Sequence, residues 1–543
     1  MKIALSQQNY ILGDFAYNLE KIKTSIDKAT ASQADLIVFS ELAICGYPPT
    51  DFFDIDDFIE KCNQAVDELL PFSHQIGILI GSPTKNKKPE GKDLFNSAIM
   101  LHQGQRVATV HKTLLPTYDI FDEYRYFEPN KTFECVSFKG KKIAITICED
   151  IWNIGNENPM YEISPMDELV KQAPDFMINL SASPFSFSHS DERKQIVKEN
   201  CLRYQIPIFY CNSVGAQTEI IFDGGSLVCD KLGNPIVEMS YFEEDFAVVD
   251  SQSLGLEKEI QPFKDKNERI YKALVMGIRD YFAKSGFKKA VLGLSGGIDS
   301  ALTCVLAADA LGSQNVLSVL MPSEFSTSHS VDDALNLCKN LNSPYEILEI
   351  KENFDSILGN LKPIFGNRPF DVAEENLQAR IRGMLLMAVS NKFGNILLNT
   401  SNKSEMAVGY GTLYGDMCGG IAVLGDVYKT EVYDLSRYIN RLTEIIPINS
   451  IEKAPSAELR PGQKDQDSLP PYEILDAVLF QYIEKKKSPM DIVAMGFEEA
   501  LVRRIVNMVN RNEFKRFQAA PILRVSSKAF GYGRRIPIVA KYL

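Results

Sequence analysis

The most constraining feature of this sequence is the segment KKAVLGLSGGIDSALTCVLAADALG, residues 288–312, in which an apolar run passes through a glycine pair into a second apolar stretch. A strand that turns directly into a helix is typical of parallel α/β sheets. No lysine follows the glycines as in GxxxxGK[ST], so an anion would be held by backbone N–H groups and the positive helix end. Ser295 and Ser300 add hydroxyl donors, and Asp299 is better placed for Mg²⁺ than for a phosphate. A glycine pair alone would only make the turn, whereas this combination favours a pyrophosphate site.

The chain is too long for one hydrophobic core and contains two α/β patterns. Over its 543 residues, β-type and helical segments alternate in two blocks separated by a polar, lysine-rich stretch. We expect residues 1–252 to form a layered α/β domain, 253–268 a linker, and 269–543 a second domain with a doubly wound, Rossmann-like parallel sheet. Residues 447–472 are rich in proline and charge and are predicted to be a mobile loop or lid.

The charge and the cysteine pattern weigh against several classes of function. A net charge of −13 and a pI near 5.2 argue against a broad nucleic-acid-binding surface, which needs excess positive charge. The ten cysteines show no CxxC spacing and no signal-like segment begins the sequence, which is typical of reduced thiols in a cytoplasmic protein. No apolar run approaches the roughly 18 residues of a membrane helix. Five scattered histidines make a structural zinc site unexpected.

The SGGxDS pattern resembles the pyrophosphate loop of the N-type ATP pyrophosphatases. Members of this family convert ATP to AMP and pyrophosphate while they adenylate a carbonyl or carboxylate oxygen. The resemblance implies a requirement for Mg²⁺ and leaves open which group is adenylated and which nucleophile displaces AMP. The ATP-binding residues that it implies are Gly293, Leu294, Ser295, Gly296, Gly297, Ile298, Asp299 and Ser300.

Three polar residues in the first half of the chain follow apolar, strand-like segments. Glu41 follows LIVFS, Lys112 follows VATVH, and Cys148 follows IAITI. A thiol that attacks an amide needs a base, a cation for the oxyanion and an acid for the departing ammonia. Each residue alone is typical of a solvated charge or a core cysteine, but together they supply these functions.

These segments resemble the nitrilase-like amidohydrolases over nearly all of residues 1–250. The resemblance implies an α-β-β-α sandwich in which Glu41 is the general base, Lys112 the oxyanion cation and Cys148 the nucleophile that forms a γ-glutamyl thioester. Glu123 matches a second glutamate that supports the lysine in that family.

The same resemblance implies a glutamine-binding site. Tyr118 and Ser183 fall where glutamine-handling relatives contact the amino acid. His189 stands where relatives often have a basic side chain, and a neutral histidine would bind the α-carboxylate of glutamine less well than lysine or arginine.

The second half of the chain resembles the ammonia-ligating NAD synthetases in residues 375–391, 399–435 and two segments near the C-terminus. The resemblance implies that Thr400 contacts ATP, that Asn376 and Lys515 contact deamido-NAD, and that Glu405 binds this dinucleotide or shares Mg²⁺ with Asp299. Further candidates around the phosphates, the nicotinate and the lid are Lys403, Asp416, Lys429 and Ser456.

The two halves together resemble the glutamine-dependent NAD⁺ synthetases, ligases that amidate deamido-NAD with ammonia released from glutamine. The implied partners are small molecules, namely deamido-NAD, ATP and glutamine, with no nucleic acid or membrane. A homo-oligomer is also expected.

Three alternatives remain open. The first is an amidotransferase with the same ATP chemistry and another acceptor, such as a purine nucleotide, aspartate or tRNA. Residue 2 is Lys2, which disfavours the glutaminase type that serves aspartate. Cys148 lies in ICED, which disfavours the glutaminase type that serves purine nucleotides. The second is a scaffold with vestigial sites, which the joint presence of the three polar residues and SGGIDS disfavours. The third is a synthetase whose glutaminase half is inactive, for which His189 is the one indication.

Overall fold

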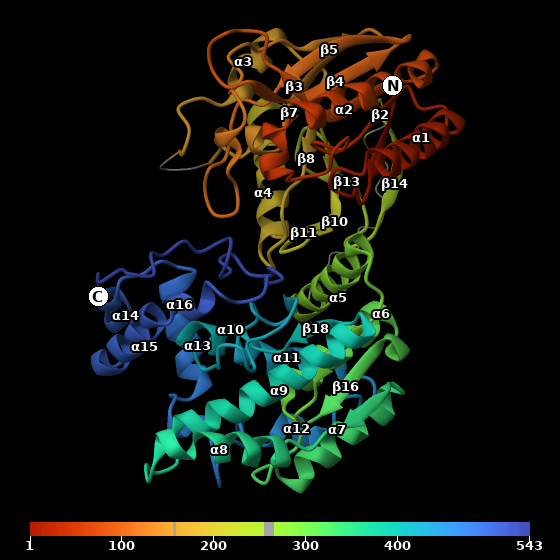
Figure 1. Cartoon of the computed structure of the whole chain (residues 1–543). Helices are drawn as coiled ribbons and strands as arrows, with labels where there is room; N and C mark the ends of the chain where they lie inside the picture. Colours follow the sequence, from red (N-terminus) through yellow and green to blue (C-terminus); the bar gives the residue numbers. More distant parts are fainter. Residues whose placement is uncertain (156–158, 253, 255–264, 543) are drawn as a thin grey trace. The chain divides into compact units, whose positions relative to one another are not determined.

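The computed structural model describes residues 1–155, 159–252, 254 and 265–542, which belong to two compact units, Met1–Lys264 and Asp265–Leu543 (Figure 1). Most of the predicted linker, residues 253–268, lies outside the described residues. Its described end is helical, because Asp265 caps helix α5 (Lys266–Ser285) by accepting a hydrogen bond from the Asn267 N–H at 2.8 Å. Regular structure in the second unit therefore starts before the predicted boundary at residue 269.

The first unit contains two six-stranded sheets, with strand orders β14-β1-β2-β3-β4-β5 and β13-β12-β9-β8-β7-β6. A short hairpin, β10 with β11, accompanies them. The strands are β1 (Lys2–Gln7), β2 (Leu36–Val38), β3 (Gly77–Lys85), β4 (Leu94–His102), β5 (Gln105–His111), β6 (Val136–Phe138), β7 (Lys141–Ile147), β8 (Phe176–Ser181), β9 (Ile208–Asn212), β10 (Val214–Gln217), β11 (Ile220–Asp223), β12 (Leu227–Cys229), β13 (Pro235–Glu238) and β14 (Asp245–Asp250). The helices are α1 (Phe15–Ala31), α2 (Asp56–Asp67), α3 (Pro165–Leu169) and α4 (His189–Tyr204).

Alternating side chains along the strands build the layers of this unit. In β1, Ile3 and Leu5 join the core between the two sheets, where they meet residues such as Ile145 of β7. Ala4 faces the opposite way, into a core that includes Ile22 of α1 and residues of α2. Helices α3 and α4 cover the outer face of the second sheet through a third cluster. The result is the α-β-β-α sandwich expected from the sequence.

The second unit is built on a five-stranded parallel sheet of order β17-β16-β15-β18-β19. Its strands are β15 (Ala290–Gly293), β16 (Val316–Leu320), β17 (Tyr345–Ile347), β18 (Ile396–Asn399) and β19 (Ile421–Ala422). The helices after α5 are α6 (Ile298–Leu311), α7 (Ser328–Leu341), α8 (Lys351–Phe365), α9 (Val372–Phe393), α10 (Lys403–Val408), α11 (Lys429–Ile439), α12 (Ile448–Glu452), α13 (Tyr472–Ile483), α14 (Pro489–Ala494), α15 (Glu499–Arg511) and α16 (Glu513–Arg516).

The order of these strands creates a crevice at the centre of the sheet. The chain proceeds outward from β15 to β16 and β17 on one side, and from β18 to β19 on the other. In doubly wound sheets, ligands bind outside the carboxyl ends of the strands where the order reverses. The predicted SGGIDS turn lies at this point, between β15 and α6, so the predicted doubly wound sheet is confirmed. Among the described residues, no helix has the combined length and apolar character needed to cross a bilayer.

Candidate active sites

In the first unit, a buried ion cluster joins three residues from distant parts of the sequence. Lys112 directly follows β5, and its Nζ donates to Glu41 Oε1 at 2.7 Å and to Glu123 Oε1 at 2.8 Å. All three side chains are almost inaccessible to solvent. Two carboxylates face one ammonium, so the cluster carries a net negative charge when all three groups are ionised.

Side chains that the sequence did not indicate hold this cluster in place. Asn96 of β4 donates to Glu41 Oε1 at 2.7 Å, and the Ala182 N–H donates to Glu41 Oε2 at 3.0 Å. The Tyr47 hydroxyl donates to Glu123 Oε1 at 2.8 Å. These contacts fix the carboxylate of Glu41, as a positioned general base requires. Nothing in the local sequence around Asn96 or Tyr47 signals such a contact.

The charges of the cluster perturb one another. Burial alone would lower the pKa of Lys112, but the Glu123 and Glu41 carboxylates raise the pKa of this ammonium well above its usual value. Burial raises the pKa of Glu123 to about 7, and Glu41 adds to the increase while Lys112 opposes it. Lys112 therefore stays a cation, which suits the oxyanion role implied by the resemblance.

Cys148 lies at the turn from β7 into a short 3₁₀ helix, Cys148–Ile151, with a φ of +43°. Left-handed backbone at a residue other than glycine is unusual and clusters at functional sites. The Asp150 carboxylate holds this turn, because it accepts the N–H groups of Ile147, Thr113 and Leu114 at 3.0, 2.9 and 2.8 Å. One carboxylate thus ties the turn after Cys148 to the segment after Lys112.

The thiol of Cys148 is neutral in this environment. Burial and the Glu41 carboxylate raise the pKa of Cys148 well above its usual value, although Lys112 lowers it. A thiol is a poor nucleophile until a base removes its proton. The Glu41 carboxylate is fixed by three hydrogen bonds, and its charge contributes to the raised pKa of the thiol.

Glu149 directly follows Cys148 and lines a cavity of about 560 Å³. Tyr118 donates to both Glu149 oxygens at 3.0 Å, and Tyr161 donates to Oε1 at 3.2 Å. Tyr118 lines the same cavity together with Trp152 and Tyr161. Of the predicted glutamine-binding residues, the structure thus places Tyr118 at this cavity. Glu149, Trp152 and Tyr161 were not predicted, although Glu149 and Trp152 lie in the CEDIW motif.

Ser183 and His189 contact each other next to this cavity but do not line it. The Ser183 hydroxyl and His189 Nε2 are 3.0 Å apart. The His189 ring stacks on Trp152 with a centroid separation of 4.8 Å, and its Nδ1 lies 3.5 Å from a Glu192 carboxylate oxygen. The imidazole of His189 is therefore in contact with the Trp152 ring, the Ser183 hydroxyl and the Glu192 carboxylate.

Glu123→Gln is expected to remove a pH dependence of stability from the first unit. Because the folded-state pKa of Glu123 is about 7 against an ordinary value of 4.5, the folded state binds more protons than the unfolded state between these values. Stability is therefore fully present below about pH 4.5 and falls as pH rises to about 7, by about 2–3 kcal/mol. Urea unfolding at pH 5 and pH 8 measures this decrease, and the exposed control Glu90→Gln should retain it. An equal decrease in wild type and Glu123→Gln would contradict the prediction.

In the second unit, the SGGIDS turn is shaped by its first glycine. Gly296 has a φ of +80°, and a Cβ on it would meet the Ser330 carbonyl oxygen at 2.0 Å. Ser295 Oγ accepts the Gly297 N–H at 3.2 Å and lies 3.1 Å from Ser300 Oγ. The Ser300 hydroxyl donates to the Gly297 carbonyl at 3.0 Å. These contacts hold the turn at the N-terminus of α6, where backbone N–H groups and the helix dipole favour an anion.

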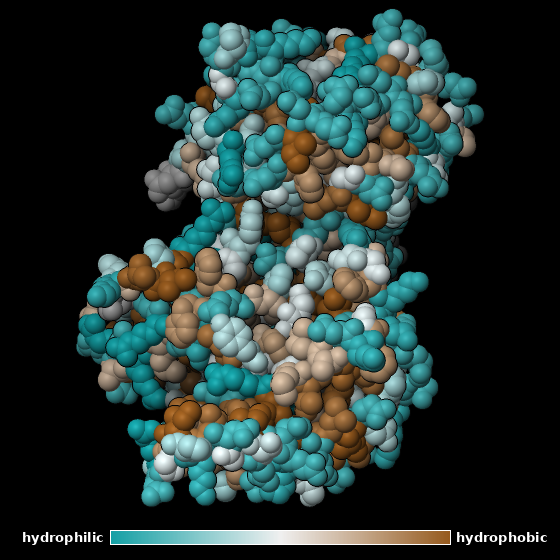
Figure 2. Space-filling model, viewed as in Figure 1, coloured by the Kyte–Doolittle hydropathy of each residue, from teal (hydrophilic) through white to brown (hydrophobic). Residues whose placement is uncertain are grey.

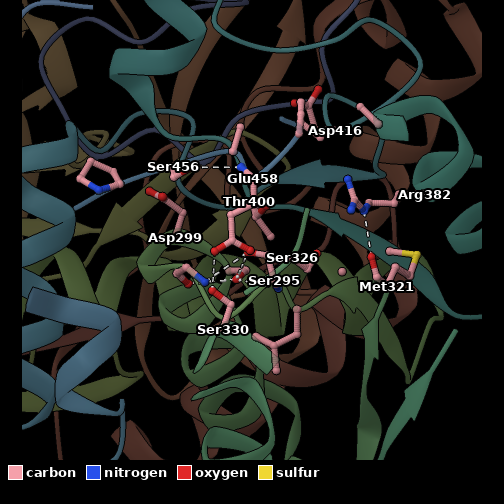
Figure 3. A pocket seen from close by; sticks show the side chains of 18 of the residues that line it. Ser295, Asp299, Met321, Ser326, Ser330, Arg382, Thr400, Asp416, Ser456 and Glu458 are labelled. Carbon is pink, nitrogen blue, oxygen red and sulfur yellow. Dashed lines mark hydrogen bonds between the residues drawn. The ribbon is translucent and has the colours of Figure 1, made fainter. Parts of the chain in front are cut away.

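This turn lines a cavity of about 570 Å³ at the carboxyl ends of β15, β16 and β18. Seven of the eight loop residues from Gly293 to Ser300 line it, Gly296 being the exception, and so does Thr400. Figure 3 shows Asp299, Thr400, Asp416 and Ser456 around this space. Further predicted residues at the cavity are Glu405 and Lys429.

Asp299 and Glu405 lie on either side of one buried cation. Lys429 Nζ forms an ion pair with Asp299 and lies 3.8 Å from Glu405 Oε1. Burial and the Asp299 carboxylate raise the pKa of Glu405 well above its usual value, and Lys429 opposes this increase. The Lys429 pKa rises because these two carboxylates outweigh the effect of its own burial.

The carboxylate oxygens of Asp299 and Glu405 are ligands of the kind that Mg²⁺ prefers. Mg²⁺ commonly uses one or two carboxylates and completes its octahedron with waters and substrate phosphates. Among the described residues, no group of three or more His, Cys, Asp or Glu side chains is arranged to hold a metal. Asp299 and Glu405 would therefore hold the ion only together with phosphate oxygens.

The structure does not place three other predicted residues at the cavity. Asn376 accepts a hydrogen bond from the Thr412 hydroxyl at 2.7 Å, and Lys515 Nζ donates to the Gly409 and Gly411 carbonyls at 2.8 Å. Both thus contact the 409–412 segment. Lys403 is fully buried, with Nζ at 2.9 Å from carboxylates of both Asp426 and Glu484. Its ammonium is neutralised inside the fold rather than exposed to a ligand.

The charged cavity residues that were not predicted as ligand contacts include Arg382 and Glu458. Arg382 of α9 donates from Nε to the Met321 carbonyl at 3.0 Å, and burial lowers the pKa of its guanidinium to about 10 (Figure 3). Glu458 lies in the segment predicted as a lid and has a φ of +49°. Residues 453–460 of that segment form part of the cavity wall.

Glu458→Ala is expected to release this segment. The Glu458 carboxylate accepts the Thr327 hydroxyl at 2.7 Å, the Ser330 hydroxyl at 2.8 Å and the Thr327 N–H at 3.3 Å, all at the start of α7. Charge-assisted hydrogen bonds are the strongest anchors available to a half-buried loop. Trypsin cleavage after Lys464, followed by mass spectrometry, should become about tenfold faster because opening free energy controls proteolysis. The exposed control Glu452→Ala should leave the rate unchanged, and an unchanged rate in Glu458→Ala would contradict the anchor.

Known families match both units of the chain. Residues 2–257 match the carbon-nitrogen hydrolase family, and residues 270–519 match the NAD synthase family. The fold and the two sites thus define a class of protein in which an amidase unit and an NAD synthase unit share one chain.

Full-length relatives define the family more closely. The glutamine-dependent NAD(+) synthetase of Synechocystis sp. is 45% identical and covers 99% of both chains, and that of Thermotoga maritima is 39% identical over 100% of this chain and 99% of the relative. A solved structure of the glutamine-dependent NAD⁺ synthetase from Acinetobacter baumannii in complex with ADP aligns with a TM-score of 0.79 and 38% identity, covering 100% of this chain and 99% of that one. The chain belongs to the glutamine-dependent NAD(+) synthetase family. The sequence-based identification of a ligase of this family is confirmed, and NAD synthetases use ATP as a cosubstrate.

Proposed function

We propose that this chain makes NAD⁺ from deamido-NAD, with glutamine as nitrogen source and ATP giving AMP and pyrophosphate. The observation that carries the proposal is the presence of both candidate sites in one chain. One is the buried Glu41–Lys112 pair that acts on the Cys148 thiol. The other is the SGGIDS turn, which lines the cavity of the second unit.

The first half-reaction releases ammonia. Glu41 takes the proton of the Cys148 thiol, and the thiolate attacks the amide carbon of glutamine. Lys112 stabilises the oxyanion, because its ammonium remains charged inside the cluster. Glu41 returns its proton to the departing ammonia and leaves a γ-glutamyl thioester. Water activated by Glu41 then attacks the thioester, which yields glutamate and restores the thiol.

We propose that glutamine binds in the cavity beside Cys148, next to the Ser183–His189 pair. Tyr118 and Glu149 line the cavity, so they can contact the amino-acid end of the substrate. Ser183 and His189 would contribute through their mutual contact at 3.0 Å.

The second half-reaction activates the acceptor. A nicotinate carboxylate oxygen attacks the α-phosphorus of ATP, and pyrophosphate departs against the SGGIDS turn at the N-terminus of α6. Thr400 and Lys429, which line the cavity, would bind ATP. Mg²⁺ held by Asp299 and Glu405 would supply positive charge to the phosphates. Ammonia then attacks the acyl carbon, AMP leaves with the bonding electrons of the acyl–oxygen bond, and the nitrogen releases one proton to solvent to become the neutral amide.

The dinucleotide is proposed to contact the 409–412 segment. Asn376 and Lys515 both hold this segment by hydrogen bonds. Substrate contact by these two residues would occur where the segment meets the cavity, next to Asp416.

We also propose a cytoplasmic homo-oligomer with small-molecule partners and no nucleic acid or membrane. All ten cysteines are free thiols, which suits a reducing compartment. Exposed apolar side chains gather along α8 and α9, where Ile364, Met384 and Phe393 are 72%, 55% and 67% exposed (Figure 2). A patch of this kind is typical of a protein–protein contact.

A panel of acceptors tests the proposed reaction. The purified chain, ATP, Mg²⁺ and ammonium are combined with deamido-NAD, a purine nucleotide or aspartate, and AMP and pyrophosphate are measured. We expect AMP and pyrophosphate in equal amounts with deamido-NAD alone. Products with another acceptor would replace the substrate assignment, and ADP with phosphate would contradict adenylation.

A further inference from the structure

Asn402 lies between β18 and α10, directly after the cavity residues Thr400 and Ser401, and is completely buried. Its side chain contacts two parts of the fold at once. Oδ1 accepts the Glu405 N–H at 3.0 Å and caps α10, while Nδ2 donates to Asp299 Oδ1 at 2.8 Å. Its backbone N–H donates to Glu405 Oε2 at 3.3 Å.

These contacts connect the two carboxylates that would hold Mg²⁺. Asp299 stands on α6 after β15, and Glu405 stands on α10 after β18, so no local structure fixes one relative to the other. The other oxygen of Asp299, Oδ2, is paired with Lys429. Asn402 is therefore the neutral group that orients Asp299 and, through the cap, the first turn of the helix that carries Glu405.

The chemical identity of the residue matters for this role. Ser, Thr, Asp and Asn all cap helices well. An aspartate here would add a third carboxylate against Asp299, and serine is too short to reach Asp299 as the amide does. Asparagine alone among them combines an acceptor for the cap with a neutral donor of this length.

We propose that Asn402 is a positioning residue that sets the geometry of Asp299 and Glu405 for a divalent cation bound with ATP. The inference rests on the proposed function, because it concerns the cation of the adenylation step. Groups that orient metal ligands without touching the metal commonly change metal affinity by about 10–100-fold when they are removed.

The test uses Asn402→Ser in the full chain, which keeps a helix-capping oxygen and loses the donor to Asp299. Two quantities are measured: Mn²⁺ binding in the presence of ATP by electron paramagnetic resonance, and the Mg²⁺ concentration for half-maximal AMP formation. We expect both to shift to about tenfold higher metal, with the rate largely restored at saturating Mg²⁺ and glutamine hydrolysis unchanged. A merely structural role would lower the rate at every Mg²⁺ concentration and leave the half-maximal concentration in place.

Two comparisons make the result interpretable. Ser488→Asn is the reverse substitution at another helix cap, since Ser488 caps α14. It should not change the metal requirement. Asn402→Gly, which also suits a cap position, repeats the test if the serine variant does not fold. Wild type without Mg²⁺-dependent AMP formation would overturn the proposed function. Active wild type with unchanged metal binding in a folded Asn402 variant would overturn the role of Asn402 alone.

Discussion

Cys148→Ala is expected to abolish NAD⁺ formation from glutamine, by about 10³-fold or more, while NAD⁺ formation from ammonium survives. The reason is the division of chemistry between the units. Within the Glu41–Lys112–Cys148 set, Lys112 is held protonated and so cannot attack the amide carbon, and the thiolate is a stronger nucleophile than the Glu41 carboxylate. Alanine leaves the buried ion cluster intact, since Lys112 bonds to Glu41 and Glu123 and not to the thiol.

The measurement is NAD⁺ formation with either nitrogen source in the same preparation. Cys135→Ala is the matched control, because that half-buried thiol donates to the Leu169 carbonyl at 3.5 Å and lies outside the cluster. It should retain both activities. Loss of both activities in a folded Cys148→Ala protein would contradict the division between the two sites.

Gly296→Ala should produce the opposite pattern, with glutamine hydrolysis retained and AMP formation lost from either nitrogen source. An added methyl would lie 2.0 Å from the Ser330 carbonyl oxygen, so the turn or α7 must move. A displacement near 1 Å at a phosphate-binding loop costs about 100-fold in rate. We therefore expect a reduction of at least that size in AMP formation.

Gly312→Ala separates this clash from ordinary backbone strain. Gly312 has a φ of +84°, close to that of Gly296, but a Cβ there meets nothing nearer than 3.8 Å. Alanine is strained at both positions because φ is positive, and at Gly312 the cost is at least the left-handed penalty of about 1–2 kcal/mol, since its ψ of 134° lies outside the left-handed helical region. Equal losses of AMP formation in the two variants would show that strain, and not the shape of the loop, is responsible.

The features predicted from the sequence were those with strong local patterns. The SGGIDS turn was predicted because a strand, a glycine pair and a helix follow one another directly. Cys148 and Lys112 were found because each directly follows an apolar strand, and the structure places both residues directly after strands β7 and β5.

The features that escaped prediction depend on tertiary contacts. Asn96 reaches Glu41 across 55 positions of sequence, and Asn402 reaches Asp299 across 103. No local pattern distinguishes these asparagines from others. The same limit explains Lys403, which the family resemblance made a candidate near the phosphates although Asp426 and Glu484 neutralise it inside the fold.

Isotope transfer tests the central claim most directly. The wild-type chain is given deamido-NAD, ATP, Mg²⁺ and glutamine labelled with ¹⁵N in the amide as the only nitrogen source, and the NAD⁺ is analysed by mass spectrometry. The account predicts NAD⁺ with one ¹⁵N in its nicotinamide and one AMP for each NAD⁺ formed. Glutamine hydrolysis without labelled NAD⁺, in a preparation that makes NAD⁺ from ammonium, would contradict it.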